Sequence, residues 1–170
     1  FTVFGDRVLF SASDSANNME LWVTDGTPAG TRLVEDINPG LPSGGGPSGF
    51  TIFGDRVLFE ADDGVHGVEL WVTDGTTAGT SLVKDVNPGG PGGLRYGGEF
   101  RVLGDRVLFT ADDGVGGHEL WATDGTTAGT SIVKDISPGS EGSWAGGFVV
   151  FGDRVLFGAD DGVNGGELWA

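Results

Sequence analysis

The chain alternates short apolar runs with turns rich in glycine and aspartate. In the second of its repeats the runs are Phe50–Phe53, Arg56–Ala61, Val68–Thr73 and Ser81–Val86, which we designate strands A to D. Short apolar runs bounded by turn residues predict β-strands joined by tight turns. Outside residues 6–25, no stretch free of Gly and Pro exceeds nine residues, which excludes helices between the strands. The pattern therefore predicts four antiparallel strands in each repeat.

The motif Gly-Asp-Arg-Val-Leu-Phe divides the chain into repeats. It recurs at intervals of 49, 50 and 48 residues, starting at Gly5, Gly54, Gly104 and Gly152. In the first three repeats this glycine lies 34 residues before the closing Pro-Gly, so all variation in length falls in the loop from strand D to the next strand A, the D–A loop. The predicted units are residues 1–49, 50–99 and 100–147, with an incomplete fourth unit at 148–170.

Four short antiparallel strands in a period of about 49 residues are typical of a β-propeller blade. Apolar residues occupy both faces of the strands, with Val57 and Phe59 on one face and Leu58 on the other, as sheets packed between neighbouring sheets require. We predict an all-β fold, the arc of a β-propeller with three complete four-stranded antiparallel blades and three strands of a fourth.

The predicted arc is too short to close by itself, because closed propellers have about four blades or more. It is expected to be a fragment of a larger ring or one arc of an oligomeric ring, with about seven or eight blades favoured. The last strand, Glu167–Trp169, is then an apolar sheet edge. Proteins seldom leave such an edge open, so we expect a further strand of the same polypeptide or a second copy to cover it.

The charge of the chain argues against several classes of partner. It has 9 Lys and Arg against 25 Asp and Glu, a formal net charge of −16 that repels phosphate backbones and anionic lipid surfaces. Cysteine is absent, which excludes disulfides, thiolate metal sites and cysteine nucleophiles. No apolar run approaches the roughly 20 residues of a membrane-spanning helix. Nucleic-acid binding and membrane insertion are therefore not expected.

Strand C leads into a longer repeated motif. In the second repeat it reads ELWVTDGT over residues 69–76, with counterparts from Glu20 and Glu119, and it is followed by VKDV and NPG over residues 83–89. This pattern resembles the signature of the bacterial ELWxxDGT-repeat proteins over essentially the whole chain. The resemblance implies a secreted or surface-attached bacterial protein with a propeller fold and no shared enzymatic activity. The first repeat departs from it with Glu35 in place of Lys84 and Lys134.

Paired carboxylates in the turns between strands B and C are candidate ligands for calcium, because Ca²⁺ prefers hard oxygen donors. The six residues are Asp62, Asp63, Asp112, Asp113, Asp160 and Asp161. Their spacing differs from that of an EF-hand, in which ligands alternate over a 12-residue loop. Asp and Gly also occupy such turns for purely conformational reasons. Calcium binding and simple turn formation are both carried forward, with turn formation favoured.

Two further repeated features are expected to be structural. A tryptophan stands at the same place of strand C in every repeat, a position that predicts packing between blades: Trp22, Trp71, Trp121 and Trp169. If residues of strands B and C pair where their numbers sum to about 130, Arg56 lies opposite Asp74, and the same register sets Arg106 opposite Asp124. Ion pairs across the hairpin are then expected.

A ligand site must break the repetition, and the D–A loops do so. Arg95 and Tyr96 lie in the second of these loops and Trp144 in the third. In an up-and-down blade the D–A loops and the B–C turns share one rim, so these three residues are candidate ligand-binding residues beside the acidic turns. The alternative is that Tyr96 and Trp144 merely cover the edges of the blades.

No arrangement typical of an enzyme is found, because the repeated charges indicate braces rather than one catalytic site and the two histidines occupy different repeat positions. We therefore expect a non-enzymatic, extracellular bacterial propeller module that serves as a surface or interaction scaffold. The alternative is a lectin-like propeller that binds glycans at the D–A rim, with calcium as a possible cofactor. Expected partners are other proteins or surface glycans, together with further blades or a second copy that completes the ring.

Overall fold

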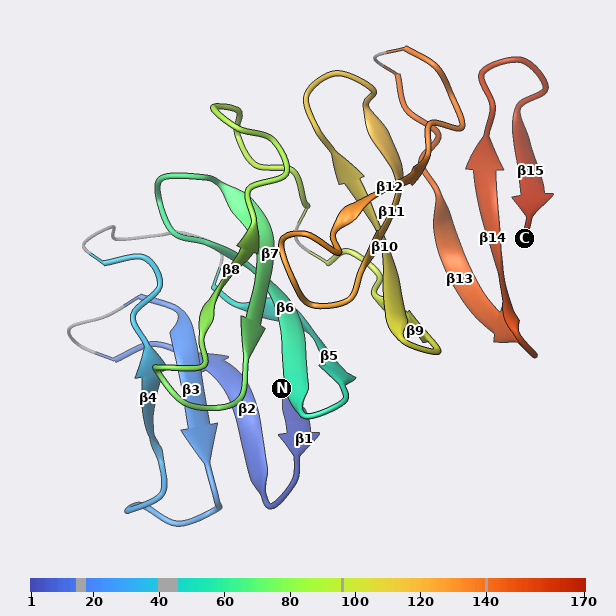
Figure 1. The fold of residues 1–170 in the computed structure, drawn as a ribbon. Helices are drawn as coiled ribbons and strands as arrows, with labels where there is room; N and C mark the ends of the chain where they lie inside the picture. Colours follow the sequence, from blue (N-terminus) through green and yellow to red (C-terminus); the bar gives the residue numbers. More distant parts are fainter. Residues whose placement is uncertain (15–17, 40–45, 96, 140) are drawn as a thin grey trace.

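The computed structural model describes residues 1–14, 18–39, 46–95, 97–139 and 141–170, which contain strands and turns and no helix. The strands follow one another along the chain without long connections (Figure 1). Their bounds are β1 Thr2–Phe4, β2 Arg7–Ala12, β3 Glu20–Thr24, β4 Arg32–Glu35, β5 Ser48–Phe53, β6 Arg56–Asp62, β7 Val68–Thr73, β8 Ser81–Lys84, β9 Arg101–Leu103, β10 Arg106–Asp112, β11 His118–Thr123, β12 Ser131–Lys134, β13 Gly146–Phe151, β14 Arg154–Asp160 and β15 Gly166–Trp169.

The strands form four separate antiparallel sheets, one for each sequence repeat. Three sheets have the order β1-β2-β3-β4, β5-β6-β7-β8 and β9-β10-β11-β12, and the fourth contains β13-β14-β15. Each sheet is a simple meander in which neighbours in sequence are neighbours in space, which is the topology of a propeller blade. The all-β prediction, with three four-stranded blades and three strands of a fourth, is confirmed. We number these sheets blades 1 to 4.

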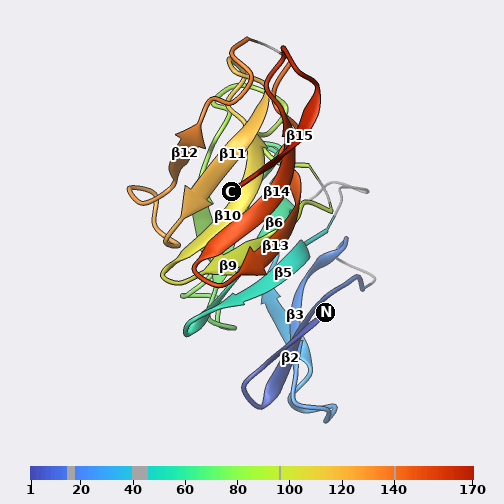
Figure 2. The same ribbon diagram turned by 90° about the vertical axis from the view of Figure 1, so that its right-hand side faces the viewer.

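The blades are arranged as an arc (Figures 1 and 2). The first strands of successive blades approach one another, with β1 in contact with β5 and β9 in contact with β13. In a propeller these first strands line the central axis and the later strands lie farther out.

The strand register confirms the pairing expected from the sequence and corrects the starts of two strands. Val57 pairs with Thr73, so the residue numbers sum to 130. In contrast, β5 and β13 start two residues before the phenylalanines with which the predicted units begin. The additional residues include Gly49 and Gly147, which have φ of 68° and 69° at irregularities in the pairing. A glycine in the left-handed region is typical of a β-bulge. From the sequence pattern alone, the same glycine predicts a loop.

Three apolar cores hold the blades together, and each lies between two consecutive blades. The core between blades 2 and 3 combines Leu58, Leu70 and Val72 of one blade with Val107 and Phe109 of the next. Equivalent residues form the cores between blades 1 and 2 and between blades 3 and 4. We call the side of a blade that meets the next blade its leading face and the opposite side its trailing face. Both faces of β6 and β11 are buried, as the two-faced apolar pattern predicted.

The strand C tryptophans belong to the trailing faces. Trp121 is buried in the core between blades 2 and 3, its ring centroid 6.4 Å from that of Phe109. Trp71 is partly buried against the core between blades 1 and 2, at the same 6.4 Å from Phe59. The predicted packing between blades is confirmed for both residues, and it is tighter for Trp121.

A lysine from the outer strand of one blade lies over the tryptophan of the next. The Nζ atom of Lys84 is 5.7 Å from the ring centroid of Trp121, and that of Lys134 is 4.8 Å from the centroid of Trp169. Lys84 also donates a hydrogen bond of 2.9 Å to the carbonyl of Thr130 in the next blade. Attraction between a cation and an aromatic face stabilises such a contact. The interblade contact explains the repeated lysine, which Glu35 replaces in blade 1.

The prediction of an ion pair between Arg56 and Asp74 is wrong, although the strand register from which it was made is confirmed. The guanidinium of Arg56 lies 4.0 Å from the neighbouring Asp55, and Asp74 Oδ1 accepts hydrogen bonds from the N–H and the hydroxyl of Thr76. The second expected pair, Arg106 with Asp124, fails in the same way, because Asp124 accepts from Thr126. An aspartate at the start of a tight turn satisfies the local backbone, and that demand outweighs an exposed ion pair.

Candidate functional site: the rim of the D–A loops

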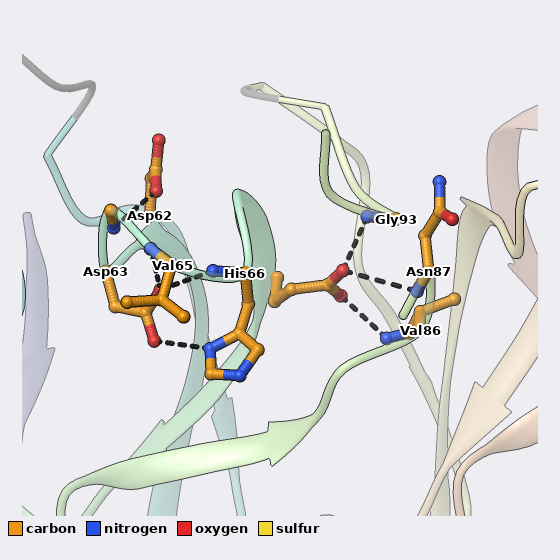
Figure 3. Close-up of polar contacts among 9 residues, drawn as sticks. Asp62, Asp63, Val65, His66, Val86, Asn87 and Gly93 are labelled. Atoms are coloured by element: carbon orange, nitrogen blue, oxygen red, sulfur yellow. Dashed lines mark hydrogen bonds and ion pairs between the residues drawn. The ribbon is translucent and has the colours of Figure 1, made fainter. Parts of the chain in front are cut away.

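A buried glutamate at the start of strand C anchors the D–A loop of its own blade. Glu69 Oε1 accepts hydrogen bonds from the backbone N–H groups of Gly93 at 2.6 Å and Asn87 at 3.4 Å, and Oε2 accepts from Val86 at 3.1 Å (Figure 3). Its side chain is fully buried. The carboxylate thus satisfies backbone donors that would otherwise be buried without partners.

A buried glutamate accepts backbone hydrogen bonds at the same position of the other two complete blades. Glu119 accepts hydrogen bonds from the N–H groups of Ile136, Ser137 and Ser143 and from the Ser143 hydroxyl, the last at 2.6 Å. Glu20 accepts from Ile37 at 2.7 Å. The first letter of the repeated ELW motif is therefore a structural carboxylate, and sequence reasoning missed this role. The sequence does contain a signal for it, because an acidic residue recurs at the start of an apolar strand in every repeat, which indicates a structural role for the carboxylate.

Burial raises the pKa of Glu69 to about 7 from an ordinary value of 4.5. Three backbone N–H donors oppose the shift, and the nearby charge of Asp85 adds to it. Desolvation disfavours the charged carboxylate, and the donors recover only part of that cost. Glu69 therefore titrates near neutrality while it anchors the loop.

Backbone hydrogen bonds join the second and the third D–A loop each to two blades. In the loop after blade 2, Leu94 donates to the carbonyl of Val68 in blade 2, and Asp112 of blade 3 donates to the carbonyl of Gly93, at 2.9 and 2.8 Å. The loop after blade 3 repeats the arrangement, because Trp144 donates to His118 at 3.1 Å and Asp160 of blade 4 donates to Ser143. Val68 and His118 start strand C, whereas Asp112 and Asp160 end strand B. The prediction that D–A loops and B–C turns share one rim is confirmed.

Two of the three predicted ligand-binding residues meet at this rim. The guanidinium carbon of Arg95 lies 4.8 Å from the ring centroid of Trp144, although the two residues come from different D–A loops. Tyr96, the third predicted residue, lies outside the described residues. Trp144 is 55% exposed. Its φ of 54° lies in the left-handed region, which residues other than glycine rarely adopt. The indole thus lies at the surface on a residue with an unfavourable backbone conformation.

His118 completes this cluster, and sequence reasoning had assigned it no role. The Arg95 Nε–H donates a hydrogen bond of 2.7 Å to His118 Nε2, and the imidazole ring lies 4.9 Å from the Trp144 ring, centroid to centroid. An acceptor nitrogen at Nε2 requires the neutral imidazole with its proton on Nδ1. Burial, reinforced by the positive charge of Arg95, lowers the pKa of His118 from its ordinary 6.5.

The three side chains border a groove of about 290 Å³ between the two D–A loops, which we call the rim groove. Its lining residues are Arg95, Gly97, Gly98, Glu99, Thr110, His118, Trp144, Ala145 and Gly146. A cation, a carboxylate, a hydroxyl and an exposed indole therefore face one concave surface. This is the combination of an apolar platform with a few oriented polar groups that ligand sites use.

Non-repeating side chains on strand B support the walls of the groove. Glu60 is fully buried and accepts hydrogen bonds from the N–H groups of Gly97 and Gly98. At the equivalent position of blade 3, Thr110 donates its hydroxyl to the carbonyl of Ala145. The same strand position thus carries whichever side chain its own D–A loop requires, and the groove is fixed in shape by buried contacts.

Comparisons with known proteins add little to this picture. No protein-family model and no curated protein matches the chain. Among solved structures, the crystal structure of TolB from Acinetobacter baumannii is similar over 96% of this chain and 42% of its own, with a TM-score of 0.48 and 17% sequence identity. The chain therefore spans less than half the length of that structure.

The aspartates proposed as calcium ligands form the turns between strands B and C. Asp62 accepts from the N–H of Gly64, and Asp63 accepts from the N–H groups of Val65 and His66 and contacts the His66 ring at 2.7 Å (Figure 3). The turns containing Asp112, Asp113, Asp160 and Asp161 repeat the backbone bonds. Within the described ranges, no group of three His, Cys, Asp or Glu residues is placed to hold a metal ion.

Because the carboxylates already accept backbone hydrogen bonds, we expect millimolar calcium to raise the melting temperature no more than sodium chloride of equal ionic strength. Screening of the −16 charge acts for both salts, whereas specific binding would add a term for calcium alone. Differential scanning calorimetry in the two salts measures this. A larger shift in calcium that disappears in the Asp63→Asn, Asp113→Asn variant would instead identify the turns as calcium sites.

Proposed function

We propose that this chain is a non-enzymatic, propeller-type interaction module that binds its partner at the rim groove. The observation that carries the proposal is that the repeated residues stabilise the fold, whereas residues that are not repeated line the groove. The repeated glutamate, tryptophan, aspartate and threonine side chains are engaged in tethers, interblade cores and turns. Arg95 and Trp144, which have no counterpart of the same residue type in the other repeats, line the groove.

The groove also supports a binding rather than a catalytic role. A catalytic base needs a nucleophile or substrate proton within hydrogen-bond reach. His118, the one imidazole lining the groove, is occupied at Nε2 by Arg95. Glu99 Oε2 accepts a hydrogen bond from the N–H of Phe148 and so contacts the backbone of strand β13.

An extracellular or cell-surface location in a bacterium is part of the proposal. It rests on the resemblance of the ELWVTDGT motif to the ELWxxDGT-repeat proteins. The acidic surface agrees with that location, because a net charge of −16 keeps a protein soluble and disfavours anionic surfaces. Among the described residues there is no helix long and apolar enough to cross a membrane.

A glycan is the second candidate ligand, favoured by one observation. The indole of Trp144 is more than half exposed beside a carboxylate and a guanidinium, and aromatic faces stack on the apolar faces of sugar rings while charged groups bind hydroxyls. A protein partner would use the same tryptophan and arginine, the residue types that dominate binding energy at interfaces.

A paired screen tests both ligand classes at the same groove. The purified chain is applied to an array of immobilised oligosaccharides and to a displayed peptide library, and binding is repeated with Trp144→Ala and Arg95→Ala. We expect saturable binding on one of the two platforms that weakens about tenfold or more in both variants. Val115→Ala, an exposed change in a B–C turn of the same rim, is the control and should bind normally.

The platform that binds decides between a lectin and a protein-interaction module. Binding that survives both groove substitutions would place the ligand elsewhere, and no binding on either platform would contradict the proposal.

A further inference from the structure

Arg95 brings a positive charge to the rim groove that no carboxylate of the chain neutralises. All 25 Asp and Glu residues lie among the described residues, and none of them forms an ion pair with Arg95 there. Three other arginines, Arg7, Arg56 and Arg154, lie 3.7 to 4.0 Å from the aspartate that precedes each of them. In a strongly acidic chain, the charge of Arg95 is therefore left available to a ligand.

Neutral groups hold the guanidinium of Arg95 in place. Its Nε–H donates a hydrogen bond of 2.7 Å to His118 Nε2, and its guanidinium carbon lies 4.8 Å from the ring centroid of Trp144. An imidazole that accepts this bond is neutral, so both contacts fix the side chain without cancelling its charge. Among the described residues, the Nη groups donate no hydrogen bond. They form the planar fork with which arginine binds both oxygens of a carboxylate.

We propose that the rim groove binds an acidic sugar, with Arg95 as the residue that binds its carboxylate. The inference rests on the proposed function, which places the binding site at this groove, and it adds the chemical class of the ligand. The groove has a volume of about 290 Å³. Small-molecule sites typically measure about 300–1,000 Å³, so this one accommodates a group of the size of a single sugar ring.

The other side chains of the groove match the rest of an acidic sugar. Trp144 is 55% exposed and offers an apolar surface to one face of a pyranose ring. Glu99 is exposed, and its Oε2 accepts the N–H of Phe148, which leaves the carboxylate with acceptor capacity for sugar hydroxyls. A carboxylate, an apolar ring face and hydroxyls occur together in an acidic sugar. An acidic side chain of a protein would supply the carboxylate alone.

The charge of the whole chain limits how many acidic sugars the ligand carries. A formal net charge of −16 repels a polysaccharide with a carboxylate on every residue. A single acidic sugar on an otherwise neutral glycan meets the local charge of Arg95 and little of that repulsion. The expected ligand is therefore a glycan with one acidic sugar rather than a polyanion.

Titration of the isotope-labelled chain with three small probes, followed by NMR at neutral pH, tests the inference. Methyl glucuronide carries the ring and the carboxylate, methyl glucoside carries the ring alone, and the amide of N-acetylglutamate carries a carboxylate on a peptide unit. The reporter is the indole N–H signal of Trp144, assigned with the Trp144→Phe variant. We expect methyl glucuronide to shift this signal with a Kd about tenfold or more below that of either other probe.

Substitutions of Arg95 separate its charge from its shape. Arg95→Gln removes the charge, so methyl glucuronide should bind no better than methyl glucoside. Arg95→Lys keeps the charge without the planar fork and should recover only part of the preference. Arg56→Gln makes the same charge change at the end of strand β6 that lies away from the rim, and this control should bind like the wild type. Both arginines are exposed, so all variants should retain the wild-type circular dichroism spectrum.

Each alternative result overturns a stated part of the inference. Equal affinity for methyl glucoside, or a preference for methyl glucuronide that survives Arg95→Gln, would remove the carboxylate from recognition. Equal affinity for the N-acetylglutamate probe would remove the sugar and indicate an acidic protein partner. If no probe shifts the Trp144 signal, the inference fails. The proposed function is then decided separately, because binding in the paired screen that depends on Trp144 and Arg95 would keep the groove as the site for a ligand of another class.

Discussion

Replacing Trp121 by alanine is expected to lower the free energy of unfolding by about 3–5 kcal/mol. Trp121 is 5% exposed and fills the core between blades 2 and 3, where it contacts the Phe109 ring and lies under the Lys84 ammonium. Removing it leaves a cavity between two blades that cannot close without moving them. Urea denaturation monitored by far-UV circular dichroism measures the change.

Two further variants separate packing from the other properties of the indole. Trp121→Phe keeps an aromatic ring and removes a buried Nε1–H that has no hydrogen-bond partner, so it should cost clearly less than alanine. Trp144→Ala, at an exposed position on the rim, should change stability by less than about 1 kcal/mol. A Trp121→Ala variant as stable as Trp144→Ala would show that the blades are not held by this core.

The second large effect is expected at Glu69, where alanine should lower the free energy of unfolding by about 3 kcal/mol at pH 5. Three backbone N–H groups of the D–A loop lose their acceptor, and each buried donor without a partner costs about 1–3 kcal/mol, offset in part by relief of the carboxylate's own burial. Urea denaturation at pH 5 measures the loss. Glu99→Ala is the control. Glu99 borders the rim groove and accepts a single backbone hydrogen bond, so its replacement should lower the free energy of unfolding by less.

The cost of Glu69→Ala is also expected to depend on pH. The pKa is about 7 in the folded protein and near 4.5 when unfolded, so the stability that the group contributes is full below pH 4.5 and is lost as pH rises through 7. The difference of about 2.5 pKa units corresponds to roughly 3 kcal/mol. The stability gap between wild type and variant should therefore narrow from pH 5 to pH 8.5. A constant gap would mean that Glu69 keeps the same charge throughout that range.

Much of the architecture follows from the sequence because its causes are local. Spacing of apolar runs fixed the number of strands, and turn residues such as Asp74 fixed where each hairpin ends. The register of strands B and C followed from the turn length between them, and the structure confirms it. The identical length of every repeat core predicted identical blades, and the variable D–A loops correctly indicated the rim at which the candidate site lies.

Contacts between segments that lie far apart in the sequence could be found only from the tertiary structure, because residue spacing does not show which of these segments meet. Arg95, His118 and Trp144 come from two loops and a strand, and only blade packing brings them within 5 Å. The ion pair predicted for Arg56 failed because local backbone donors compete better than an exposed cation for the carboxylate of Asp74. The anchoring role of Glu69 depends on where the D–A loop returns, and a loop's path is set by the blades that it joins rather than by its own residues.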